Sequence, residues 1–142
     1  MALRHRRLIL LGLLALPILS IAGEEEDAES AVNRIRCAVS SQAYDDLYDN
    51  LTSEYFKAKS RRSDFIQNLK QGRATVGAVV TTTSLFHTYS DFDSQTGYRG
   101  KIYSFDFHVK YERAAFFERI VVTKDPDGRY RLAGLWANPA PN

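Results

Sequence analysis

The sequence predicts an α+β domain in which N-terminal helices pack on a curved, four-stranded antiparallel sheet. Two observations lead to this fold class. Up to about position 71, apolar residues recur every three or four positions, which is the period of a helix. Beyond that point the period falls to two, and Val, Thr and aromatic residues become frequent, as in strands. Helices grouped before strands favour α+β over an alternating α/β arrangement.

Residues 1–22 have the three parts of a secretory signal peptide. Basic residues at 4–7 precede an apolar run at 8–16, and the small residues Ser20 and Ala22 precede a cleavage site before Gly23. Because a spanning helix needs about 20 apolar residues, cleavage is favoured over a retained N-terminal anchor. We therefore expect a periplasmic or secreted protein, in contact with a membrane only if this segment is uncleaved.

Charge and composition limit the class of the mature protein. Three of the 19 lysine and arginine residues lie in the signal, which leaves 16 basic side chains against 17 acidic ones. That balance gives no support for nucleic-acid binding. An apolar share of 44% and a charged share of 25% are ordinary for a globular domain. We expect one domain over residues 23–137 and a flexible tail over 138–142.

The first helix is predicted from one apolar stripe over residues 28–47, preceded by acidic residues at 24–27 that suit its first turn. Asn50 and Thr52 interrupt this stripe, and Thr52 is a candidate cap for a second helix. Cys37, the single cysteine, falls within the first helical pattern, so we expect it to be buried.

A third helix is predicted over residues 64–71. Ser63 is a suitable N-cap, and Gly72 suits the C-terminal stop. Gly77 is expected to mark a bulge or bend at the start of the strand region.

Four strands joined by short turns are predicted over residues 75–89, 98–111, 115–124 and 130–136. The second alternates most clearly. Its apolar face consists of Tyr103, Phe105, Phe107, Val109 and Tyr111, and its polar face of Ser104, Asp106, His108 and Lys110. We expect the aromatic face to line the core and Trp136 to cover one end of it.

Three parts of the chain carry a resemblance to a known family. They are Gln42-Ala43-Tyr44-Asp45-Asp46-Leu47-Tyr48 with residues 51–55; Phe65 and Leu69 with Gly72-Arg73 and Val76-Gly77; and Glu118 with Asp127-Gly128, Tyr130-Arg131 and Ala133-Gly134. In pattern and order, residues 28–136 resemble small exported bacterial members of the nuclear-transport-factor-like, or cystatin-like, cone superfamily.

This resemblance implies a sheet that wraps a long helix and leaves a pocket at the open end. Some members of the superfamily are enzymes, such as ketosteroid isomerase and scytalone dehydratase, whereas many bind ligands or dimerise through the sheet. The fold therefore leaves the activity open.

Glu118 is the strongest candidate site residue, because it shares the alternation phase of Phe116 and Ile120. A carboxylate on an apolar face needs a partner or a raised pKa. Arg73, Arg131 and Tyr103 are candidate partners. We expect either a structural ion pair or a polar anchor for a ligand, with a general base as the third interpretation.

The candidate ligand-binding residues are Glu118, Tyr103, His87 and Arg131. For His87 a hydrogen-bonded position in the core or at its rim is favoured over proton transfer. Asp106, His108 and Lys110 share a polar sheet face, which predicts a solvated surface or a partner surface rather than a catalytic pair.

The function expected from these features is a non-catalytic binding or accessory module of the cell envelope with a small apolar pocket. One alternative is a subunit of a membrane complex held by an uncleaved N-terminal helix. A second is an isomerase or dehydratase, which requires Glu118, or Asp106 with His108, to face a closed apolar cavity. A homodimer or an envelope protein is the expected partner. No metal spacing or phosphate-binding loop is present, so we expect no cofactor.

Overall fold

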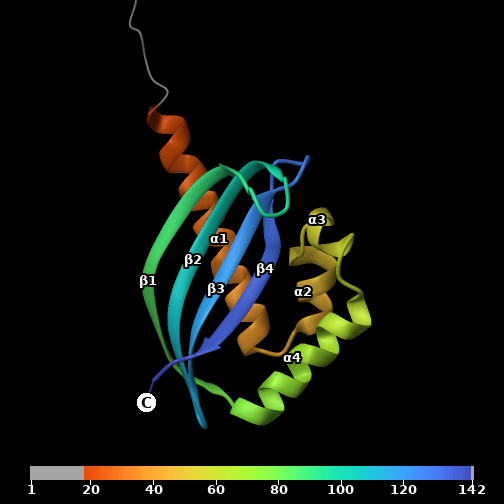
Figure 1. Cartoon of the computed structure of the whole chain (residues 1–142), viewed down its shortest axis with the longest axis vertical. Helices are drawn as coiled ribbons and strands as arrows, with labels where there is room; N and C mark the ends of the chain where they lie inside the picture. The colour runs from red at the N-terminus through yellow and green to blue at the C-terminus, as the bar shows by residue number, and fades with distance from the viewer. Residues whose placement is uncertain (1–17, 142) are drawn as a thin grey trace, which may run out of the picture.

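The computed structural model describes residues 18–141, in which helices come first and strands follow (Figure 1). This order confirms the predicted α+β class. The elements are α1 (Ile18–Ser40), α2 (Tyr44–Leu51), α3 (Glu54–Lys57), α4 (Arg62–Val76), β1 (Val79–Phe92), β2 (Arg99–Tyr111), β3 (Ala115–Lys124) and β4 (Tyr130–Pro139). Most of the expected signal segment, residues 1–17, lies outside the described residues. Among residues 18–141, no helix has both the length and the apolar character that crossing a membrane requires.

The four strands form one antiparallel sheet in the order β1-β2-β3-β4. Figure 1 shows this sheet bending around α1, with α2, α3 and α4 beyond the β4 side. The core lies between α1 and the inner sheet face. On β2 it contains Tyr103, Phe105, Phe107 and Val109, each at most 6% exposed, which confirms the predicted aromatic face. The buried residues of α1 are Ala28, Ala31, Val32, Ile35 and Ala38.

The predicted first helix is wrong in its length, because the apolar stripe continues across a break. A turn at Ser41, Gln42 and Ala43 separates α1 from α2, and Gln42 adopts a left-handed φ of 61°. After this turn Leu47 returns to the core, so the spacing of apolar residues conceals the break. The helix also begins already at Ile18, which places Glu24 inside α1 rather than in its first turn.

Three of the predicted helix ends are also wrong. Ser53, not Thr52, caps α3 by accepting a hydrogen bond of 3.2 Å from the Phe56 N–H. Gly72 lies within α4, which ends instead at Gly77 with a φ of +83°. Ser63 is likewise inside α4 rather than at its N-cap.

Cys37 and Trp136 are exposed, contrary to prediction. Cys37 stands two positions from the buried Ile35, which turns it about 200° around the helix. A bulge in β4 turns the Trp136 side chain to the opposite face of the sheet. Val121 pairs with Gly134 and Val122 with Leu132, which leaves Ala133 unpaired. This extra residue changes the alternation phase of the following segment.

The strand ends also differ from prediction. β4 continues to Pro139, which pairs with Phe116, so the expected tail is shorter than 138–142. β1 begins at Val79, because α4 occupies the chain as far as Val76, and it runs on to Phe92. It forms an open edge of the sheet, and most of its side chains are exposed.

Candidate functional site

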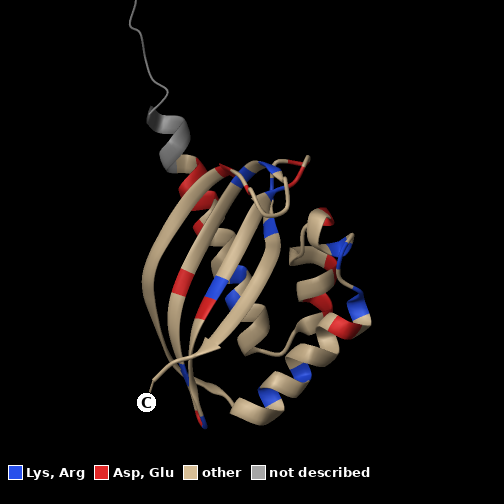
Figure 2. Ribbon diagram, viewed as in Figure 1, with Lys and Arg blue, Asp and Glu red and all other residues tan. Residues whose placement is uncertain are grey.

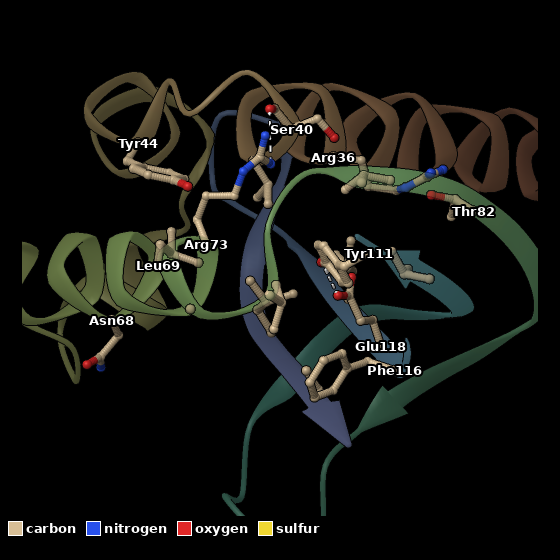
Figure 3. Close-up of a pocket in the computed structure, with 18 residues that line it drawn as sticks. Arg36, Ser40, Tyr44, Asn68, Leu69, Arg73, Thr82, Tyr111, Phe116 and Glu118 are labelled. Carbon is tan, nitrogen blue, oxygen red and sulfur yellow. Dashed lines mark hydrogen bonds between the residues drawn. The ribbon is translucent and has the colours of Figure 1, made fainter. Parts of the chain in front are cut away.

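A partly open pocket of about 250 Å³ lies between the C-terminal half of α1, α4 and the inner face of the sheet (Figure 3). Ten of its eighteen lining residues are apolar, and the other eight carry a polar or charged group in the side chain. The lining residues are Arg36, Val39, Ser40, Tyr44, Asn68, Leu69, Gly72, Arg73, Val76, Val79, Thr82, Val109, Tyr111, Phe116, Glu118, Ile120, Leu135 and Ala137.

Glu118 faces this pocket and is held by Tyr111, the last residue of β2. The Tyr111 hydroxyl donates a hydrogen bond to Glu118 Oε1, drawn as a dashed line in Figure 3. Burial raises the pKa of Glu118, while the hydrogen bond from Tyr111 and the positive charge of Arg36 act in the opposite direction. Burial and the neighbouring carboxylate raise the pKa of Tyr111. The pair therefore places a hydrogen-bonded polar contact inside the pocket.

Two guanidinium groups extend on either side of this pair, Arg36 from α1 and Arg73 from α4 (Figure 3). Arg36 lies over the Phe107 ring, 4.5 Å from its centroid. Arg73 donates a long hydrogen bond of 3.5 Å to the carbonyl oxygen of Ser40. The pocket thus combines an apolar floor with groups of both charge signs.

The structure does not bring the four candidate ligand-binding residues together, since Glu118 alone among them lines the pocket. Tyr103 is buried and packs edge-on against Tyr130, with 5.6 Å between ring centroids. The Nε2 atom of His87 lies 2.9 Å from Glu25 Oε1 at the α1–β1 contact.

Arg131 belongs to the β3–β4 hairpin, where it pairs with Asp125 at 3.0 Å and with Asp127 at 2.7 Å. It therefore does not serve as the partner of Glu118. Asp127 and Asp125 precede Arg131 by four and six positions in the sequence, so both ion pairs lie within the hairpin.

The predicted partner residues Asp106, His108 and Lys110 lie on the outer face of β2. Asp106 accepts two hydrogen bonds from Arg119, at 2.9 and 3.2 Å. The His108 ring lies 5.4 Å from that of Phe117, centroid to centroid, and Lys110 is exposed.

Aromatic residues surround the Asp106–Arg119 pair on this outer face. Phe86 pairs with Asp106 across β1 and β2, and Trp136 pairs with Arg119 across β3 and β4. Phe86, Phe117 and Trp136 are 54%, 44% and 54% exposed. In Figure 2 the middle of β2 and β3 carries a small cluster of charged residues, and further charged residues lie towards the ends of the strands.

Sequence reasoning missed Arg36 and did not foresee Tyr111 as the partner of Glu118. A signal for Arg36 was present, because it follows Val32 by four positions and precedes Val39 by three, and so shares their side of the helix. For Tyr111 the sequence shows only that it shares the alternation phase of Phe107 and Val109. Its contact with Glu118 depends on the register in which Phe107 pairs with Glu118 across β2 and β3.

A family model described as "Protein of unknown function (DUF4019)" matches residues 31–135. The chain belongs to the DUF4019 family. The matched segment of this DUF4019 protein contains the three charged residues of the pocket, Arg36, Arg73 and Glu118, and the Tyr111 that donates to Glu118. No curated protein and no solved structure matches the chain.

The lining of the pocket suits a small, largely apolar molecule. Such sites combine an apolar lining with a few convergent polar groups that orient the ligand. Within residues 18–141, no group of three or more His, Cys, Asp or Glu side chains could hold a metal ion.

Proposed function

We propose that this DUF4019 protein is an exported binding module that takes a small, largely apolar ligand into the pocket beneath its sheet. The observation that carries this proposal is the pocket of about 250 Å³, with the Tyr111–Glu118 pair and two arginines among its apolar lining. A buried carboxylate is costly to maintain, and an apolar replacement would pack without that cost. Its presence beside a pocket therefore favours a role in orienting a ligand.

Gly72 offers a direct test of the pocket. It lies in α4 and lines the pocket, and a Cβ built there meets no atom within 4 Å. Gly72→Leu should therefore occupy part of the pocket without a backbone clash, and it exchanges glycine for a better helix former. The matched control is Gln71→Leu, at the exposed neighbouring position.

Binding of 1-octanol to the purified full chain can be measured by titration calorimetry or by saturation-transfer NMR. We expect binding by the unmodified protein and by Gln71→Leu, and a loss of at least about tenfold in affinity for Gly72→Leu, because the blocked volume excludes the alkyl chain. Equal binding by all three would mean that the pocket is not the ligand site.

An enzyme is the second candidate function, favoured by the position of Glu118 in an apolar pocket and by its raised pKa. A carboxylate in such surroundings can act as a general base if its pKa approaches the working pH. Titration of Glu118 by carboxyl NMR tests this candidate. A midpoint below about 5.5 would leave the residue a weak base at neutral pH and would count against catalysis.

Two further proposals concern the compartment and the fold family. Residues 1–22 are proposed to direct export and to be removed before Gly23. An intact-mass measurement on protein recovered from the producing cell distinguishes a chain that begins at Gly23 from one that retains an N-terminal anchor. The curved sheet around α1 supports membership of the nuclear-transport-factor-like superfamily, which comparison of an experimental structure with its members would test.

The outer sheet face is proposed to contact a second copy of this chain. Its centre carries one acidic and one basic residue, Asp106 and Arg119, so two copies related by a twofold axis can place opposite charges against each other. Exposed Phe86, Phe117 and Trp136 supply the apolar area around this pair.

A further inference from the structure

The charges of the pocket lining indicate which kind of ligand it takes. Two arginines and one glutamate line the pocket, and Glu118 already receives a hydrogen bond from Tyr111. The remaining titratable lining residues, Tyr44 and Tyr111, are neutral as phenols, and burial raises the pKa of both. The lining therefore has a net positive charge whether Glu118 is ionised or protonated.

Neither arginine forms an ion pair with a carboxylate of the described residues. Arg62, Arg119 and Arg131 each form an ion pair with an aspartate at 3.0 Å or less. In the part of the chain whose side chains the structure describes, Arg36 and Arg73 form none.

Most of the hydrogen-bonding capacity of these two side chains is unused. A guanidinium has five N–H donors. Arg36 lies over the Phe107 ring and donates no hydrogen bond to a described residue, and Arg73 makes one long hydrogen bond to a backbone carbonyl. Arginine donors in this state are suited to a carboxylate or a similar anion.

The size of the pocket limits the apolar part of the ligand. A protein cavity of about 150 Å³ takes up benzene, so a pocket of about 250 Å³ takes about ten non-hydrogen atoms by the same ratio. An eight-carbon carboxylate has this size.

We propose that the ligand of the pocket is a small amphiphilic carboxylate, whose anionic end lies at the mouth beside Arg36 and Arg73 and whose apolar body lies against the inner sheet face. This inference rests on the proposed function and adds the sign of the ligand's charge. The apolar body would contact Phe116, Ile120 and Leu135.

The experiment compares three probes of equal chain length, octanoate, 1-octanol and octylamine, on the purified full chain at neutral pH and low salt. We expect octanoate to bind at least about tenfold more tightly than 1-octanol, because charge-assisted hydrogen bonds to arginine are the stronger ones. Octylamine should bind most weakly, since the two guanidinium groups repel it.

Four variants locate the effect. Arg36→Gln and Arg73→Gln should each lower octanoate affinity by about tenfold while leaving 1-octanol affinity within about twofold. Arg36→Lys, which keeps the charge, should recover part of the loss. The matched control is Arg34→Gln on the exposed side of α1, where Arg34 donates to Ser30, and it should change nothing. Circular dichroism shows that each variant remains folded.

The outcomes separate this inference from the proposed function. If 1-octanol or octylamine binds as tightly as octanoate, the pocket is a ligand site but the carboxylate assignment is overturned. The same conclusion holds if both arginine-to-glutamine variants bind octanoate as well as the unmodified protein. If none of the three probes binds, the proposed function fails, and this inference fails with it.

Discussion

At the residue scale, Glu118 shows how a strand's alternation can reveal a chemically unusual position. Its place between Phe116 and Ile120 predicts an inward direction, and the structure confirms it by placing all three in the pocket lining. Its partner is an uncharged phenol, not an arginine. A buried carboxylate with one hydrogen-bond donor and no direct ion pair is incompletely compensated, which is why its pKa is raised.

The first prediction contrasts two single-atom or near-isosteric changes in this pair. Glu118→Gln should leave the fold intact and change the free energy of unfolding at pH 7 by less than about 1 kcal/mol, because Tyr111 can donate to the amide oxygen. Tyr111→Phe should cost about 1–3 kcal/mol, since it leaves Glu118 without its donor. Urea unfolding measures both. A larger loss for Glu118→Gln than for Tyr111→Phe would instead indicate a structural role for the carboxylate charge.

The second prediction follows from the direction of the Glu118 pKa. In the folded state this pKa is raised from 4.5, so the protonated carboxyl favours the folded protein, and that contribution is lost as the pH rises from about 4.5 through the folded pKa. Glu118→Gln has no such titration. The variant should therefore gain stability relative to the unmodified protein between pH 4 and pH 7. A difference that is constant over this range would show that the pKa is not raised.

At the scale of elements, Glu24 joins the N-terminal part of α1 to three strands. It accepts hydrogen bonds from Lys101 of β2 at 2.6 Å, Lys124 of β3 at 2.7 Å and the Tyr130 hydroxyl of β4 at 2.7 Å. These donors lower the pKa of Glu24 to about 2, Lys101 contributing most. Glu24 thus holds the helix on the sheet instead of complementing the first turn of a helix.

The third prediction concerns this connection. Glu24→Gln should lower the free energy of unfolding by about 2 kcal/mol at pH 7, less than the full pKa shift implies because the lysines remain partly in water. The lowered pKa means that the contribution of Glu24 is present above pH 4.5 and is lost as the pH falls towards 2. Unfolding curves of both proteins should therefore converge in acid. Glu26→Gln, exposed and outside these contacts, is the matched control and should have little effect.

The fourth prediction compares Gly72, inside α4, with Gly77 at its C-terminal end. A Cβ has open space at the first position and meets another side chain at the second. Gly77 has φ +83° and ψ −162°, and a Cβ there would lie 2.3 Å from Glu112 Oε2. Gly77→Ala should cost about 1–3 kcal/mol, because this backbone region is accessible almost only to glycine. Gly72→Ala, with open space around its Cβ, should stabilise the protein by about 1 kcal/mol. Thermal unfolding measures both, and equal effects would contradict the assigned end of α4.

At the scale of the whole molecule, the change of period predicted the fold class, while local backbone geometry decided the details. The inner face of β2 was predictable because strand alternation is strict there. The break at Gln42 was not, because one left-handed residue lets the apolar stripe resume in α2. The position of Trp136 was not predictable either, because the extra residue in β4 places its side chain on the opposite face of the sheet. The pocket was predictable at Glu118, and Arg73 was a candidate neighbour of that residue. Arg36 was missed, because it comes from a helix whose packing on the sheet no single segment specifies.

The last prediction concerns self-association through the outer sheet face. An exposed Trp136 beside the Asp106–Arg119 pair should be buried when two copies meet, because aromatic side chains contribute most at the centre of interfaces. We expect the sedimentation coefficient to rise with protein concentration and Trp136→Ser to remove that rise.

Tyr89→Ser is the matched control, since Tyr89 is exposed to the same extent, 54%, but lies on the inner side of β1, where it pairs with the core residue Tyr103. It should leave association unchanged. Raising the salt concentration should weaken association only modestly, because the apolar area supplies most of the free energy and the single charge pair per copy sets the orientation. A monomer at all concentrations, or equal effects of the two substitutions, would show that this face does not join two copies of the chain.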